Sequence, residues 1–102
     1  MSYEKMCAGW AKLEDEIMQL VGEARLKGVA VVEAQNVMNW AVEMSDLVGG
    51  KDAESDVSLV KRHLSSLTPL QTEVVAIGEA LGDMTKADDV MDGLWDFRAV
   101  LS

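Results

Sequence analysis

The apolar positions at the start of the chain follow a regular helical spacing. They recur at alternating steps of three and four residues, at Tyr3, Met6, Trp10, Leu13, Ile17, Leu20 and Ala24. This spacing places them along one face of an α-helix, as in a heptad seam. Arg25 and Lys27 suit the negative end of a helix dipole, and Gly28 can end the helix. The pattern therefore predicts a helix over residues 3–27.

The next segment, residues 29–48, is apolar on a wide face. Its opening valines, Val29, Val31 and Val32, are typical of a strand, but its length and later period favour a helix. Such a helix is either heavily buried or shared with another subunit. Together with residues 3–27 it predicts a long antiparallel hairpin that turns at Gly28.

Shorter segments with helical spacing follow a Gly-rich stretch over residues 49–55, which we expect to be a flexible loop. The first of these three segments has its apolar residues from Val57 to Leu67. The next is expected to be a helix with Thr68 as N-cap and Pro69 in its first turn. The last is expected to be a helix that follows Thr85. The sequence thus predicts an all-α fold, a compact helical bundle in which residues 1–102 form a single domain.

Composition narrows the classes of partner. The chain has 102 residues, half of them apolar, and a net charge of −9. This charge disfavours direct binding to nucleic acid or to an anionic membrane and favours a basic partner. Cys7 is the only cysteine, and no apolar run is long enough to span a membrane, so a cytoplasmic protein is expected.

We find no pattern that indicates an enzyme, a metal site or a cofactor site. A catalytic pair would have to use Cys7 and His63, which lie in segments typical of a core edge and a helix surface. The run from Asp88 to Gly93 is similar to part of a calcium loop, but Val90 occupies a position that needs an oxygen ligand. The chain is therefore predicted to be non-enzymatic, with no cofactor.

The C-terminal segment carries an acidic stripe. Asp88, Asp92 and Asp96 are four residues apart, with Asp89 beside them. Like charges at this spacing destabilise a helix by roughly 0.2–0.5 kcal/mol per pair. The stripe is therefore either a docking surface for a basic partner or a solvated face that keeps the helix soluble. Its step of about 6 Å along the helix axis resembles that of every second phosphate on a nucleic-acid strand. The predicted partner-binding residues are Asp88, Asp89, Asp92, Asp96, Asp83 and Glu79.

These features lead to a primary hypothesis and two alternatives. The first is a small acidic inhibitor or adaptor that docks on a basic protein surface, such as one that binds nucleic acid, in the style of phage-encoded anti-defence proteins and nucleic-acid mimics. The second is a secretion-type chaperone or assembly subunit, or a homodimer, that uses an apolar face. The residues of that face are Trp10, Leu13, Ile17, Met38, Trp40 and Met44.

The third alternative is a transcription regulator. Residues 67–75 resemble the helix that opens the DNA-binding domain of response-regulator and sigma-like helix-turn-helix proteins. The resemblance implies that residues 86–101 form the recognition helix. That segment departs from the family, because it carries four aspartates against only Lys86 and Arg98.

Overall fold

The fold is all-α, as the sequence predicts. A computed structural model describes residues 3–50, 53 and 56–102, and over this part of the chain it contains helices and no strand. The helices are α1 (Tyr3–Lys27), α2 (Val31–Val48), α3 (Ser58–Leu64), α4 (Leu67–Leu81) and α5 (Thr85–Leu101). None of these helices is long and apolar enough to cross a membrane.

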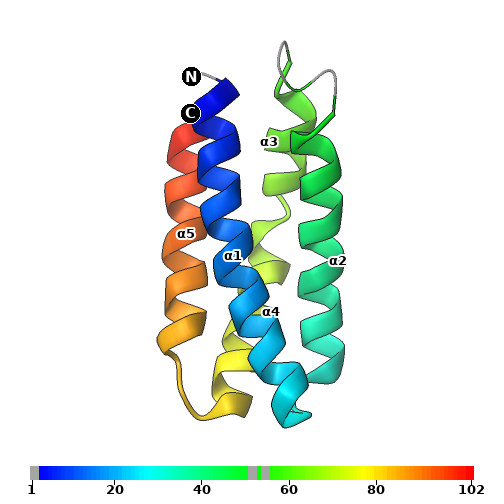
Figure 1. Cartoon of the computed structure of the whole chain (residues 1–102), viewed down its shortest axis with the longest axis vertical. Coiled ribbons are helices and arrows are strands. Elements are labelled where there is room, and N and C mark those ends of the chain that lie inside the picture. Colours follow the sequence, from blue (N-terminus) through cyan, green and yellow to red (C-terminus); the bar gives the residue numbers. More distant parts are fainter. Residues whose placement is uncertain (1–2, 51–52, 54–55) are drawn as a thin grey trace.

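The helices form four antiparallel columns, because α3 and α4 follow one another along the same column (Figure 1). The predicted hairpin of α1 and α2 is present, and α1 also packs extensively along α5. α4 contacts α2 and α5 and reaches α1 across the core. The bundle is 41 Å long, and the start of α1 and the end of α5 lie at the same end of it.

The turn between α1 and α2 explains why α2 starts two residues later than predicted. Gly28 has a φ of 67°, its N–H donates to the Arg25 carbonyl, and the Val29 N–H donates to the Ala24 carbonyl. These two bonds form a Schellman motif, which satisfies the last carbonyls of α1. Ala30 is also left-handed, with a φ of 49°, and its carbonyl accepts the first bond of α2.

The caps of the shorter helices differ from the prediction. Thr68 and Thr85 do not act as N-caps, because α4 begins at Leu67 and α5 begins at Thr85 itself. Instead, a carboxylate two residues earlier serves α3 and α5: Asp56 accepts from the backbone N–H and hydroxyl of Ser58, and Asp83 accepts from those of Thr85. Each aspartate thus satisfies a donor that the helix itself leaves unpaired.

The expected loop over residues 49–55 begins where α2 ends, at Gly49. Within it the Ala53 side chain is buried, and its N–H donates to the Gly50 carbonyl. The flexibility expected over residues 49–55 stays a prediction, and residues 51–52 and 54–55 lie outside the described residues.

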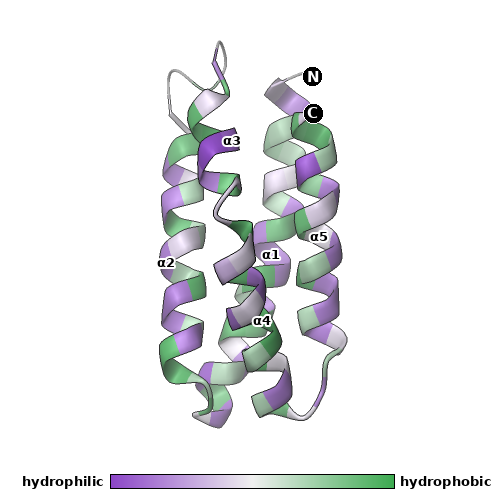
Figure 2. Cartoon of the chain, turned by 180° about the vertical axis from the view of Figure 1, so that it is seen from behind, coloured by the Kyte–Doolittle hydropathy of each residue, from purple (hydrophilic) through white to green (hydrophobic). Residues whose placement is uncertain are grey.

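A row of rings crosses the core and joins all four columns. Trp10 of α1 contacts Phe97 of α5 and Trp40 of α2, with ring centroids 5.7 and 6.0 Å apart. Trp40 in turn stacks on His63 of α3 at 4.9 Å. Figure 2 shows the α3–α4 column from behind, lying between α2 and α5. Aromatic contacts of this kind hold the columns in a fixed register.

Candidate protein-interaction site

The acidic stripe lies on the outer face of α5. Asp88, Asp89, Asp92 and Asp96 are all exposed, on the side of the helix away from the buried residues Val90, Leu94 and Phe97. Within the described part of the chain, none of the four carboxylates takes part in an ion pair. The stripe therefore presents negative charge to the solvent.

The two residues expected to extend the stripe lie near its start. Glu79 is exposed in the last turn of α4, and Asp83 lies in the connection to α5. The Thr85 hydroxyl and backbone N–H both donate to Asp83 and hold the pKa of its carboxyl below its usual value. Asp83 therefore has a structural role at the start of α5, which the sequence pattern assigned to Thr85.

A second helix adds acids that the sequence pattern did not reveal. Burial raises the pKa of Glu16, on α1, and the charges of Asp89, Asp96 and Asp15 raise it further, while Lys12 acts in the opposite direction. The two helices approach closely here, since a Cβ on Gly93 would lie 3.0 Å from Leu13 and 3.3 Å from Glu16.

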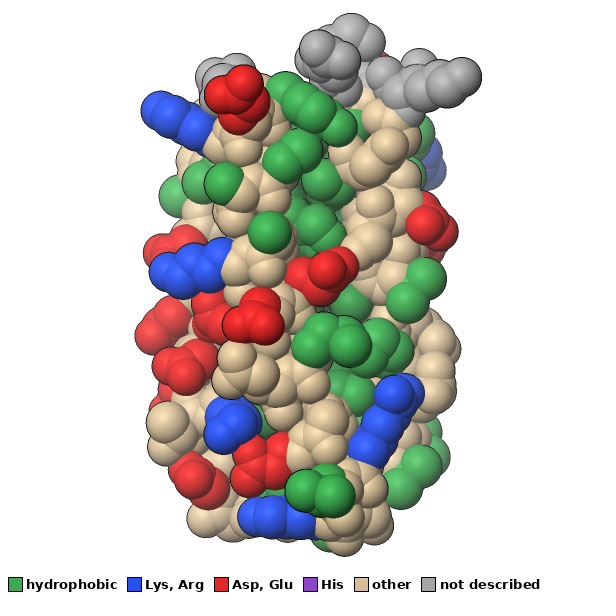
Figure 3. Space-filling model, viewed as in Figure 1, with side chains coloured by type: hydrophobic (Ala, Val, Ile, Leu, Met, Phe, Trp, Pro, Cys, Tyr) green, Lys and Arg blue, Asp and Glu red, His purple; other side chains and the backbone are tan. Residues whose placement is uncertain are grey.

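We call the combined surface the acidic face and define it as Asp15 and Glu16 of α1 with Asp88, Asp89, Asp92 and Asp96 of α5. In Figure 3, acidic side chains gather along the side of the bundle where α5 lies beside α1. Repulsion by Asp15, Asp89 and Asp96 disfavours the charged form of Glu16 in the free protein. A cationic partner would relieve that repulsion.

Two lysines lie at the end of the acidic face where α5 begins. Lys86 lies 3.0 Å and Lys27 3.5 Å from the carboxylate of Glu23. The hydrogen bond from Lys86 is the main cause that lowers the pKa of Glu23. The two lysines therefore compensate the charge of Glu23.

The predicted apolar partner face lies largely in the interior. Five of its residues are buried in the core of the single chain, and Met38 is partly buried against them. The buried residues are Trp10, Leu13, Ile17, Trp40 and Met44. The heptad seam of α1 thus packs against the chain's own α2, α4 and α5.

Cys7 and His63 both pack against side chains of the core. Cys7 packs at the edge of the core, and His63 lies on the ring of Trp40, with its Nε2 atom 3.0 Å from the Trp40 carbonyl oxygen. Among the described residues, no group of three His, Cys, Asp or Glu side chains is placed to hold a metal ion.

No protein-family model matches the chain, and neither a curated protein nor a solved structure shows significant similarity to it. The protein is therefore described by its own fold and surface. It is an up-and-down helical bundle with an acidic face across α1 and α5.

Proposed function

We propose that this chain is a non-enzymatic interaction protein that docks its acidic face on a basic protein surface, such as a nucleic-acid-binding surface, and acts there as an inhibitor or adaptor. The observation that supports this most is the set of exposed carboxylates on α5 that lack ion pairs among the described residues. Charge complementarity of this kind speeds association and selects the partner.

The packing of the bundle supports a rigid docking surface. α5 contacts α1 on one side and α4 on the other, and its buried residues Val90, Leu94 and Phe97 are almost fully inaccessible to solvent. A helix held in this way keeps its carboxylates at a fixed spacing. Fixed spacing reduces the entropy lost on binding.

The packing also argues against a helix-turn-helix role. α4 and α5 run antiparallel as neighbouring columns (Figure 1). The two helices of a helix-turn-helix cross at about 90–120°, so that the second can enter the major groove. Here the exposed face of α5 would also bring four aspartates to the phosphates.

The test is capture of partners from the native host by three forms of the chain. They are the wild type, the stripe variant D88N/D92N/D96N, and a control variant E33Q/E43Q/D46N that removes the same charge from α2. We expect a basic protein that binds the wild type and the control but not the stripe variant. A partner that binds all three forms equally would overturn the proposal.

The second candidate, an assembly subunit or chaperone, draws on a different surface. Leu26, Val31 and Val32 are 87%, 64% and 68% exposed around the turn that joins α1 to α2. For this candidate, the partner would be lost from a variant with Leu26→Gln and Val32→Thr, and salt would have little effect on its binding.

A further inference from the structure

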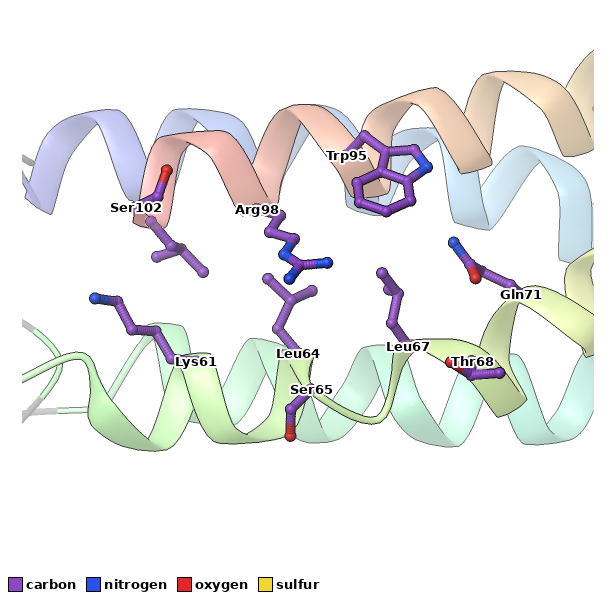
Figure 4. A pocket seen from close by; sticks show the side chains of 10 residues that line it. Lys61, Leu64, Ser65, Leu67, Thr68, Gln71, Trp95, Arg98 and Ser102 are labelled. Atoms are coloured by element: carbon purple, nitrogen blue, oxygen red, sulfur yellow. The ribbon is translucent and has the colours of Figure 1, made fainter.

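A groove lies between α5 and the α3–α4 column, on the side of α5 that faces α4 (Figure 4). It occurs where this column is interrupted at Ser65 and Ser66, between the end of α3 and the start of α4. Its volume is about 450 Å³. Sites for small organic ligands commonly have volumes of roughly 300–1,000 Å³.

The groove has an apolar floor and one exposed aromatic wall. Leu64, Leu67 and Leu101 line it and are buried, whereas Trp95 is 52% exposed. Figure 4 shows Leu64 and Leu67 extending toward α5, and Trp95 and Arg98 extending toward them. Trp10 and Trp40 are buried in the core. An indole left half-exposed beside buried leucines is well placed to cover an apolar ligand.

The charge of the groove is opposite to that of the molecule. Arg98 and Lys61 line it, and no acidic side chain does, although the chain has a net charge of −9. Neither cation takes part in an ion pair in the part of the chain that the structure describes. The Arg98 guanidinium lies over the Trp95 ring, 5.4 Å from its centroid. This stacking orients the planar fork that binds carboxylates in a bidentate manner.

We propose that this groove binds a small amphipathic carboxylate, a short acyl or aryl chain that ends in a carboxyl group. The apolar part lies between Trp95 and Leu67, and the carboxylate pairs with Arg98, with Lys61 adding positive charge farther along the groove. This site is separate from the acidic face, which lies on the outer side of α5 and on α1. Either proposal can therefore fail without the other.

Octanoate is the probe, with 1-octanol as the neutral chain of equal length and acetate as the anion without a chain. Binding is followed by two-dimensional NMR of the labelled protein. We expect octanoate to shift the Trp95 indole N–H and the amides around Leu67, with an affinity about ten-fold above that of octanol, as a charge-assisted pair provides. Acetate should cause no saturable shift.

The matched variants are Arg98→Gln, in the groove, and Arg62→Gln, an exposed arginine of α3 outside it. Arg98→Gln should abolish the preference for octanoate over octanol, and Arg62→Gln should retain it. The proposal is overturned if octanoate and octanol bind equally to the wild type, if both variants behave alike, or if the shifts lie around Leu26 and Val32 instead of the groove.

Discussion

At the residue scale, a small, partly buried polar network couples α1 to α2. The Trp10 Nε1–H donates to the Ser45 hydroxyl at 3.0 Å, and that hydroxyl donates to the carboxylate of Glu14. The other core indole, Trp40, has no hydrogen-bond partner for its Nε1 atom in the described structure. Ser45 therefore provides the hydrogen-bond acceptor without which the Nε1–H of Trp10 would also be unsatisfied.

The first prediction follows from this network. Ser45→Ala removes the acceptor of Trp10 and the donor to Glu14, and it should lower the free energy of unfolding by about 1–2 kcal/mol, as leaving partly buried groups unpaired does. Urea denaturation measures the change. Ser66→Ala, at an exposed serine whose side chain makes no cap bond, is the control and should change stability by less than about 0.5 kcal/mol. Equal effects of the two changes would refute the role of Ser45.

The second prediction concerns Glu16. Its pKa is raised mainly by burial and further by the charges of Asp89 and Asp96. Between the ordinary value and the raised one, the folded state holds a proton that the unfolded state has lost, so stability falls as pH rises through this window. Above the folded pKa the charge opposes folding in full. Glu16→Gln should therefore stabilise the protein slightly at pH 7, by less than about 0.5 kcal/mol because solvent screens this partly exposed charge, and should have no such effect near pH 4.

Thermal unfolding at the two pH values measures this difference. Glu4→Gln is the control, because Glu4 lies in the first turn of α1, where a carboxylate suits the helix dipole. That variant should be unchanged or slightly less stable at pH 7. A loss of stability in Glu16→Gln at pH 7 would show that the acids of α1 and α5 do not repel one another.

At the element scale, Gly78 of α4 packs closely against the start of α5. A Cβ on this residue would lie 2.5 Å from the Met84 sulfur and 2.8 Å from the Ala87 Cβ, so the third prediction is that Gly78→Ala destabilises the bundle by about 1–3 kcal/mol. Gly22 of α1 has nothing within 4 Å of that position, and Gly22→Ala should stabilise by about 0.5–1 kcal/mol. Calorimetry compares the two changes, and the same sign for both would contradict the packing of α4 on α5.

The bounds of the helices show how much of the fold could be predicted from the sequence. The bounds of α1 and its buried seam follow directly from the spacing of Met6 to Ala24, because one periodic face must be buried. The helix starts were harder, since Thr68, Thr85, Asp56 and Asp83 all have side chains that can cap. Local competition between such acceptors decides which one is used.

The acidic face illustrates the limit of reasoning within a single helix. The stripe of α5 is visible in the spacing of Asp88, Asp92 and Asp96. The contribution of Glu16 to the acidic face cannot be seen in the sequence, because it depends on which side of α1 packs against α5. Gly93 is the residue that permits this approach, and an isolated glycine inside a helix is the signal that could have indicated it.

At the scale of the whole molecule, the burial of the apolar seam bears on the oligomeric state. Trp10, Leu13 and Ile17 are at most 5% exposed in the single chain, so they are not available to a second copy in this fold. The fourth prediction is that the chain sediments as a monomer of 11.1 kDa at micromolar concentration. A stable dimer would show that another surface, such as the turn around Leu26, joins two copies.

The molecule as a whole separates its surfaces by charge. Carboxylates occupy the outer side of α5 and the adjoining side of α1, while Arg98 and Lys61 line the groove on the side of α5 that faces α4. The helical core fixes both surfaces relative to each other, since α5 is buried between α1 and α4. The net charge of −9 is therefore unevenly distributed over the bundle, and α5 carries four aspartates against Lys86 and Arg98.

The most direct test of docking through the acidic face is the salt dependence of binding to the captured partner. The affinity of the wild type should fall steeply between about 50 and 200 mM salt, mainly through a slower association rate. The stripe variant D88N/D92N/D96N should bind weakly with a much smaller salt dependence, and the α2 control variant should behave as the wild type. Equal affinities and equal salt dependences for all three forms would contradict the account.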